Sequence, residues 1–229
     1  MSQQLASFSE LRTFADTHHN VRAEIERVKA EVGPMVFSIV GADPEQMKAL
    51  VTFFARPDHD YPDFWSWMKA VIEETLVTDA LAIKVNKRVG GGVHSVTLLN
   101  GSTVRPVLDN NGHTPPPPAT AYTHYLQEVP RVDAVSIVTD ADLTDRHDLD
   151  ALMGYTAYDL LYLIRRHRTW TVYGYPETEQ CILNPDGYSV DVPRLLTFLQ
   201  ERLFDTLIQD VLGFEDVHWE WATNLKETK

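Results

Sequence analysis

Residues 98–125 read LLNGSTVRPVLDNNGHTPPPPATAYTHY and decide the middle of the fold. Asn100-Gly101 and Asn111-Gly112 are turn signals, because asparagine and glycine tolerate the backbone angles that tight turns need. The proline run 115–118 has no amide protons to donate and favours an extended conformation, so it predicts a spacer or a strap. Turns, short strands and a spacer indicate architecture rather than catalysis.

Towards the N-terminus, residues 63–80 place apolar side chains at helical spacing, which predicts a helix. Strands follow at 81–89, 94–100 and 102–108, which together predict a β-meander. The glycine triplet 90–92 fits a hairpin turn between the first two strands. A phosphate-binding loop would need a lysine and a following helix there, whereas a β-branched strand follows.

The flanking segments alternate between helix and strand patterns. Helices are predicted at 7–32, 44–56 and 192–212, the last one ending at Gly213. Strands are predicted at 35–40, 159–166, 170–175 and in the alternating VHWEWAT at 217–223. The fold class is therefore α+β, with helices packed around a mainly antiparallel β-meander and with a C-terminal helix. Three segments, 1–57, 58–180 and 181–229, are expected to form one compact domain.

Composition restricts the function. The 229 residues carry 33 acidic and 20 basic side chains, a formal net charge of −13, which disfavours a broad grip on nucleic-acid phosphates. Cys181 is the single cysteine, so an internal disulfide and a multi-cysteine zinc site are excluded. The start of the chain lacks the pattern of a signal peptide, and no apolar run is long enough to cross a membrane.

Residues that could carry chemistry are weak candidates. Asp140, Asp142, Asp145 and His147 lie in an acidic run, but this run lacks the glycine and the closing glutamate of an EF-hand loop. The nine histidines form no HExxH motif, and Cys181 has no basic neighbour that would favour its thiolate. We therefore expect no catalytic residue, no metal and no cofactor, and a metal-dependent enzyme using the acidic run is the less favoured alternative.

Two groups of residues are candidates for contacts. Arg165, Arg166 and Arg168 form the concentrated basic cluster, and Trp170 beside them could stack on a base, so these four are candidates for contact with DNA or a neighbouring subunit. The alternative is that these residues lie at the end of a strand and are exposed to solvent without contacting a partner. Trp65 and Trp67 are candidates for packing or for an interface, and burial beneath the proline strap is the alternative for Trp65.

Four segments, in order, resemble the wing region of portal proteins from tailed bacteriophages. They are LRTFADTHHNVRAEIERVKAEV at 11–32, DALAIKVNKRVGGGVHSVTLLNGSTVRPVLDNNG at 79–112, PPPPATAY at 115–122, and DLLY with RRHR and YGYPETEQ between 159 and 180. The family-like motif positions are Gly101, Ser102, Arg105, Pro106, Tyr122, Tyr173, Gly174, Glu179 and Gln180. After Gln180 the family continues into a stem and a clip, whereas a turn at 184–187 follows here, so the resemblance is to a shortened wing core.

The resemblance implies a structural virion protein, made in the cytoplasm of a host bacterium, and not an enzyme. Portal proteins form a ring, usually dodecameric, at one capsid vertex, where double-stranded DNA passes without sequence-specific binding. The implied partners are further copies of the chain and the capsid, terminase and connector proteins, with no membrane. A monomeric binding or adaptor module derived from a portal wing is the alternative.

Overall fold

The structure is a computed structural model that describes residues 6–41, 43–108, 113–129, 151–166, 174, 176–183 and 189–222. It divides into two compact units that interleave along the chain. Unit 1 comprises Met1–Arg22, Val71–Val85 and Leu98–Tyr188, and unit 2 comprises Ala23–Ala70, Asn86–Thr97 and Ser189–Lys229. The three consecutive segments expected from the sequence stay a prediction.

The N-terminal helical pattern forms two helices, α1 (Phe8–Thr17) and α2 (His19–Val32), where one was expected. Ser7 caps α1 reciprocally with Glu10, since each side chain accepts from the other residue's backbone N–H. The extended backbone of His18, with φ −86° and ψ 111°, ends α1. The apolar periodicity continues past this break, which explains why the sequence pattern did not reveal it.

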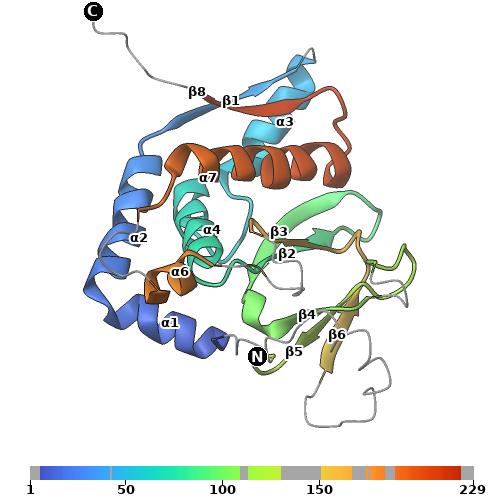
Figure 1. Cartoon of the computed structure of the whole chain (residues 1–229). Coiled ribbons are helices and arrows are strands. Elements are labelled where there is room, and N and C mark those ends of the chain that lie inside the picture. The colour runs from blue at the N-terminus through green and yellow to red at the C-terminus, as the bar shows by residue number, and fades with distance from the viewer. Residues whose placement is uncertain are drawn as a thin grey trace, which may run out of the picture. The chain divides into compact units, whose positions relative to one another are not determined.

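In unit 2, a two-stranded antiparallel ribbon joins distant parts of the chain. Strand β1 (Val36–Val40) pairs with β8 (His218–Ala222), and Ser38 lies opposite Glu220. The ribbon runs beside the long C-terminal helix, which begins as α7 (Val192–Phe198) and continues through Leu199–Phe204 and Leu207–Val211 (Figure 1). Helix α3 (Pro44–Ala55) follows β1, and α4 (Phe64–Val77) follows α3. The strands at both ends of unit 2 and these helices were predicted.

Aromatic side chains form the core of unit 2. Trp219 is fully buried and stacks on Phe37 and Phe204, each at 3.9 Å between ring centroids. Phe54 and Phe64 meet the same indole ring at 5.2 and 5.5 Å. The alternation of Trp219 and Trp221 in the terminal strand therefore does mark a face that is covered, and the cover comes from unit 2 itself.

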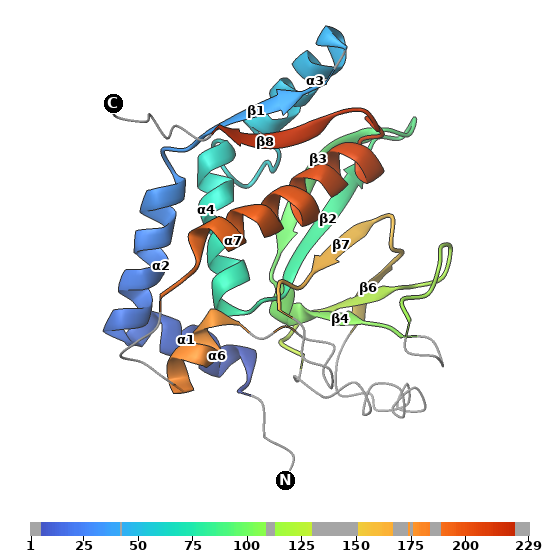
Figure 2. The same ribbon diagram turned by 45° about the horizontal axis from the view of Figure 1, so that its top comes forward.

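The predicted β-meander is wrong in its third strand. Strands β2 (Leu81–Lys87) and β3 (Val93–Leu99) are neighbours in a sheet of order β3-β2-β7, where β7 is Leu160–Leu163. Strand β4 (Val104–Pro106) instead belongs to a second sheet of order β4-β5-β6, with β5 at Tyr122–Tyr125 and β6 at Ala151–Tyr155. Figure 2 shows the two sheets as separate groups of arrows.

A short 3-10 turn, Gly101–Thr103, redirects the chain between these sheets. Asn100 caps the turn by accepting from the Ser102 N–H at 3.1 Å. A methyl group on Gly101 would overlap the carbonyl oxygen of Ala80, so this position admits only glycine. Close approach to the backbone that follows α4 therefore explains why β4 leaves the first sheet.

The proline run is not a continuous extended strap. The Ala119 N–H donates to the Pro116 carbonyl oxygen at 3.1 Å and closes a turn within the run. Helix α6 (Glu177–Leu183) was not predicted, because its segment was read as part of a sequence motif. The strand predicted at 170–175 and the loop predicted at 132–152 lie mostly outside the described residues.

The fold class is α+β with antiparallel pairing, as the sequence predicted. The described residues of unit 1 include apolar clusters. One contains Phe8, Leu11, Ala80 and Val129, and another contains Ala82, Val104, Tyr155 and Leu160. Within the described residues, no helix combines the length and the apolar character that crossing a membrane requires.

Replacing Trp219 by Ala should lower the free energy of unfolding by about 3–5 kcal/mol, because the stacked rings on both faces lose their partner and a cavity remains. Urea unfolding followed by circular dichroism measures this loss. Val51→Ala is the matched control, since Val51 is exposed and should change the value by about 0.5 kcal/mol or less. Equal losses for the two variants would contradict this account of the unit 2 core.

Candidate functional site

Buried charges gather in unit 1 around the end of helix α4. Glu74, Asp79, Glu177 and Glu179 are all buried, although carboxylates usually stay in water. Thr78 and Asp79 connect α4 to β2, and their neighbours come from the segments near residues 165, 174 and 177. We call the group formed by Asp79, Arg165, Arg166, Gly174 and Glu177 the Asp79 cluster.

Asp79 itself fixes the chain that follows β7. One carboxylate oxygen accepts the Arg165 N–H at 2.7 Å, and the other accepts the Arg166 N–H at 2.9 Å. The Asp79 backbone lies in the left-handed region with φ +47°, which aspartate tolerates better than most residues. In this conformation the carboxylate reaches the two amides.

Gly174 approaches the other side of the same carboxylate. A methyl group built on Gly174 would overlap the Asp79 carboxylate, and it would also lie 2.5 Å from the Asp79 carbonyl oxygen. Residue 174 must therefore be glycine for the backbone to pass this close. Asp79 thus contacts two segments that lie far from it in sequence.

Glu177 at the start of α6 pairs with both arginines. Its carboxylate pairs with the Arg165 guanidinium, and the Arg166 guanidinium lies 2.8 Å from the same oxygen. The side chains of Arg165 and Glu177 are only 5% and 3% exposed, whereas that of Arg166 is 27% exposed. Removing one partner from such a buried pair leaves an uncompensated charge, which is costly.

Glu74 organises a second set of contacts one turn earlier on α4. Its carboxylate accepts from the Arg12 guanidinium at 2.8 Å and from the Gly101 N–H at 3.0 Å. Arg12 also donates to the Asn100 side chain at 2.7 Å. Helix α1 and the turn that redirects β4 are therefore both anchored to α4.

Burial dominates the electrostatics of Asp79. Loss of water contact raises the pKa of Asp79 from its ordinary 3.8 to about 6, although the two N–H donors and the nearby arginine charges act in the opposite direction. The charged form therefore exists near neutral pH, and the carboxylate becomes protonated in mildly acidic solution.

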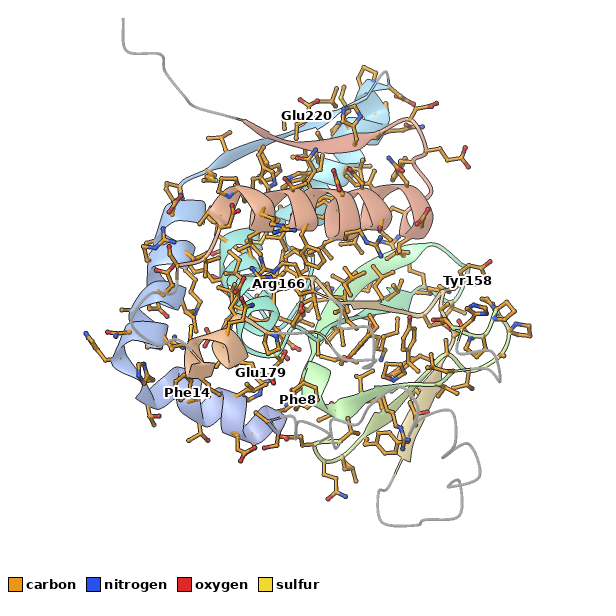
Figure 3. The ribbon with its side chains drawn as sticks, in the orientation of Figure 1. Phe8, Phe14, Tyr158, Arg166, Glu179 and Glu220 are labelled. Carbon is orange, nitrogen blue, oxygen red and sulfur yellow. The ribbon has the colours of Figure 1, made fainter. Side chains whose placement is uncertain are left out.

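The structure places Arg165 and Arg166 within the Asp79 cluster. Arg165 points into unit 1, and Arg166, labelled in Figure 3, keeps part of its side chain in solvent. Arg168 and Trp170 lie outside the described residues. The contact of these four residues with DNA or a neighbouring subunit stays a prediction.

The two candidate tryptophans lie in unit 2. Trp67 is fully buried, with its ring centroid 6.1 Å from that of Phe64. Trp65 is half-buried and meets Phe64 at 4.9 Å and Phe37 at 6.3 Å. Both therefore contribute to packing, and an interface role for the exposed part of Trp65 stays a prediction.

The family-like motif positions divide between two places in unit 1. Gly101, Ser102, Gly174, Glu179 and Gln180 lie near the end of α4 or on α6, and Gln180 donates to Glu177 at 3.1 Å. The remaining described positions belong to the second sheet, where Arg105 lies opposite Thr123 and Pro106 lies opposite Tyr122. Tyr173 lies outside the described residues.

Within the described residues, no group of three or more metal-binding side chains converges. The acidic run with Asp140, Asp142, Asp145 and His147 lies outside that part of the chain. Cys181 is buried. The carboxylates of the Asp79 cluster contact N–H donors and guanidinium groups. These contacts hold the end of α4, the segment after β7 and the start of α6 together.

Asp79 was missing from the residues chosen from the sequence, although it belongs to the DA pair of the second resembling segment. An acidic residue between the end of a helical pattern and the start of a strand pattern was the available signal. Such residues usually cap helices or stay in water, so burial against residues 165 and 166 could not be inferred.

Two solved structures are similar in fold. One is the neck of an empty gene transfer agent particle, with a TM-score of 0.53 and 8% identity over 80% of this chain and 44% of the other. The second is the virion of a native gene transfer agent particle, with a TM-score of 0.51 and 9% identity over 86% of this chain and 47% of the other. The chain spans less than half the length of these proteins. No protein-family model and no curated protein matches it.

The raised pKa of Asp79 predicts how stability depends on pH. Because the folded pKa lies above the unfolded one, protonation favours the folded state, and this stabilisation is complete below about pH 4 and is lost as the pH rises through about 6. Relative to Asp79→Asn, the wild-type chain should lose about 2–3 kcal/mol of unfolding free energy between pH 4 and 7.

Urea unfolding of both proteins at a series of pH values measures this difference, and the carboxylates common to both cancel. Asp191→Asn serves as the matched control, since Asp191 is exposed at the start of α7. A difference between wild type and Asp79→Asn that stays constant, or that grows in favour of the wild type as the pH rises, would contradict the prediction.

Proposed function

We propose that this chain is a non-enzymatic structural component of a phage-like particle, of the portal type. In this role copies of the chain form or join a ring at a capsid vertex, through which double-stranded DNA passes and on which motor and connector proteins dock. The observation that carries the proposal is the likeness of its fold to chains of gene transfer agent neck and virion structures over 80% and 86% of its length.

The Asp79 cluster adds support from within the chain. Asp79 comes from the second of the four portal-like segments, whereas Arg165, Gly174 and Glu177 come from the last one. Segments that were matched separately in the sequence therefore meet at one joint. A resemblance that follows the contacts of a core is better evidence for a shared fold than four isolated matches.

The charge of the chain suits a particle wall along which DNA moves. A protein of formal charge −13 repels phosphates over the Debye length, so DNA can pass without being held. The acidic run of the metal-dependent alternative lies outside the described residues, so that alternative stays untested. A monomeric adaptor with the same fold remains the alternative, and the mass of the native protein distinguishes it.

Light scattering or native mass spectrometry of the purified chain, across a concentration series, tests the proposal. We expect a discrete species with the mass of a closed ring, and negative-stain images should show annular particles. A monomer at every concentration would contradict self-assembly and would favour the adaptor.

A local DNA contact is part of the same proposal. The Arg165 guanidinium forms a buried ion pair with Glu177, so a charge reversal at Arg165 would destabilise the fold. Arg168 is therefore the better site for a test. Arg168→Glu should weaken salt-dependent DNA association measured by fluorescence anisotropy, because one phosphate contact is lost. Arg194→Glu, at an exposed position of α7, is the control. Identical salt titrations for both variants would remove this role.

A further inference from the structure

The hairpin of β2 and β3 ends in a defined turn, residues 87–92, which we call the hairpin tip. The Arg88 N–H donates to the Gly92 carbonyl oxygen at 2.9 Å, and the Gly91 N–H donates to the Arg88 carbonyl oxygen at 3.0 Å. Gly91 and Gly92 have φ values of +85° and +74°, which glycine adopts without strain. Two hydrogen bonds therefore close the tip, and the glycines allow its backbone angles.

At the tip, the apolar side chain of Val89 follows two exposed cationic residues and precedes three glycines, which have no side chains. Val89 is fully exposed, and Lys87 and Arg88 beside it are exposed as well. Gly90 has no positive φ and no atom within 4 Å of the position where a Cβ would lie. The turn thus does not require glycine at 90, and its absence of a side chain would let another surface come close to the backbone.

A complementary surface lies elsewhere in unit 2, on the outer face of the β1–β8 ribbon. We call Val36, Ser38 and Val40, with Glu220 across from Ser38, the ribbon face. Val36 is 53% and Val40 37% exposed, although the opposite face of the ribbon covers the aromatic core. Glu220 reaches outward from the ribbon in Figure 3.

Carboxylates flank β1 in sequence. Glu31 precedes β1, and Asp43 and Glu45 follow it at the start of α3, all with exposed side chains. On this face the small Ser38 lies between Val36 and Val40, and Glu220, whose carboxylate lies 3.1 Å from the exposed His218 ring, lies across from it. Two valines around a small residue, with a carboxylate beside them, are the complement of a valine with two cations beside it. Burial of Val89 removes apolar area from water, while opposite charges on the rim set the orientation.

We propose that the hairpin tip of one copy docks on the ribbon face of a second copy, with Val89 against Val36 and Val40. Lys87 and Arg88 then lie beside Glu220 and the flanking carboxylates. This inference rests on the proposed function, and it specifies which surfaces join the copies.

A second copy is the partner because one chain carries both halves of the contact. The hairpin tip and the beginning of β1 lie at different sides of unit 2 in both views (Figures 1 and 2). A contact between two different surfaces is heterologous, and such contacts form a ring when the rotation from copy to copy closes and an open filament when it does not. Lys87 and Arg88 also offset, at the contact, the repulsion between copies of formal charge −13.

Disulfide cross-linking tests the contact directly. The single native Cys181 is buried, so the wild-type chain gives a low background. Under mild oxidation, the double variant Val89→Cys with Ser38→Cys should form a ladder of covalent trimers and larger species, because each copy contributes both halves. Each single variant should give no species beyond a dimer. Absence of a ladder from the double variant, or efficient tip-to-tip dimers from Val89→Cys alone, would overturn the proposal.

Charge reversal tests the rim independently. Lys87→Glu with Arg88→Glu should raise the concentration for half-maximal assembly by about tenfold or more, whereas Arg194→Glu with Arg202→Glu, which makes the same change in net charge at exposed positions, should leave it within about twofold. Adding Glu220→Lys to the hairpin variant should recover part of the assembly. Equal effects of the hairpin pair and the control pair would show that net charge alone matters and would overturn the proposal.

Assembly of the wild-type chain separates this contact from the proposed ring. If the wild-type chain forms the ring-sized species while the cysteine pair gives no ladder, the copies join through other surfaces and this inference alone is wrong. If the wild-type chain stays monomeric at every concentration, the proposed function is wrong and this contact falls with it.

Discussion

The carboxylate of Asp79 is the constraint on which unit 1 depends. It accepts the N–H groups of Arg165 and Arg166 at 2.7 and 2.9 Å, and its other side is closed by Gly174. These contacts set where β7 ends and where α6 can begin, and Glu177 of α6 then balances the arginine charges. Desolvating a carboxylate is expensive, so the geometry must provide donors on each side for the folded chain to keep it buried.

Unit 2 is held in a different way, by apolar contact rather than by charge. Trp219 lies between Phe37 and Phe204, so the last described strand, the first strand and the C-terminal helix meet at one indole ring. A two-stranded ribbon is marginally stable in water without a surface to pack on, and this aromatic core provides that surface. The inner face of the ribbon therefore stabilises unit 2, whereas its outer valines are partly exposed, contribute little to the free energy of folding and are available for another role.

Much of the fold could be predicted from the sequence because its patterns are local. Helices α3 and α4, the β2–β3 hairpin and the ribbon strands follow from periodicity, and Gly213 ends the last helix as expected. The departure of β4 to a second sheet could not be predicted, since it depends on Gly101 lying against the Ala80 backbone. The Asp79 cluster was missed for the same reason, because its partners lie 86 and 87 residues away. The basic residues near 165 were noticed, but their pairing with Glu177 depends on this unpredicted burial.

The pairing of β1 with β8 has a consequence for how the chain is made. Val36 lies opposite Ala222, so synthesis must reach at least residue 222 before β1 finds its partner. Until then Phe37 and the other rings of unit 2 lack the indole that covers them. Pairings between such distant segments are slow to form because a long loop must close first. The nascent chain therefore exposes this aromatic surface until β8 has been made, a period in which chaperone binding and premature association compete with folding.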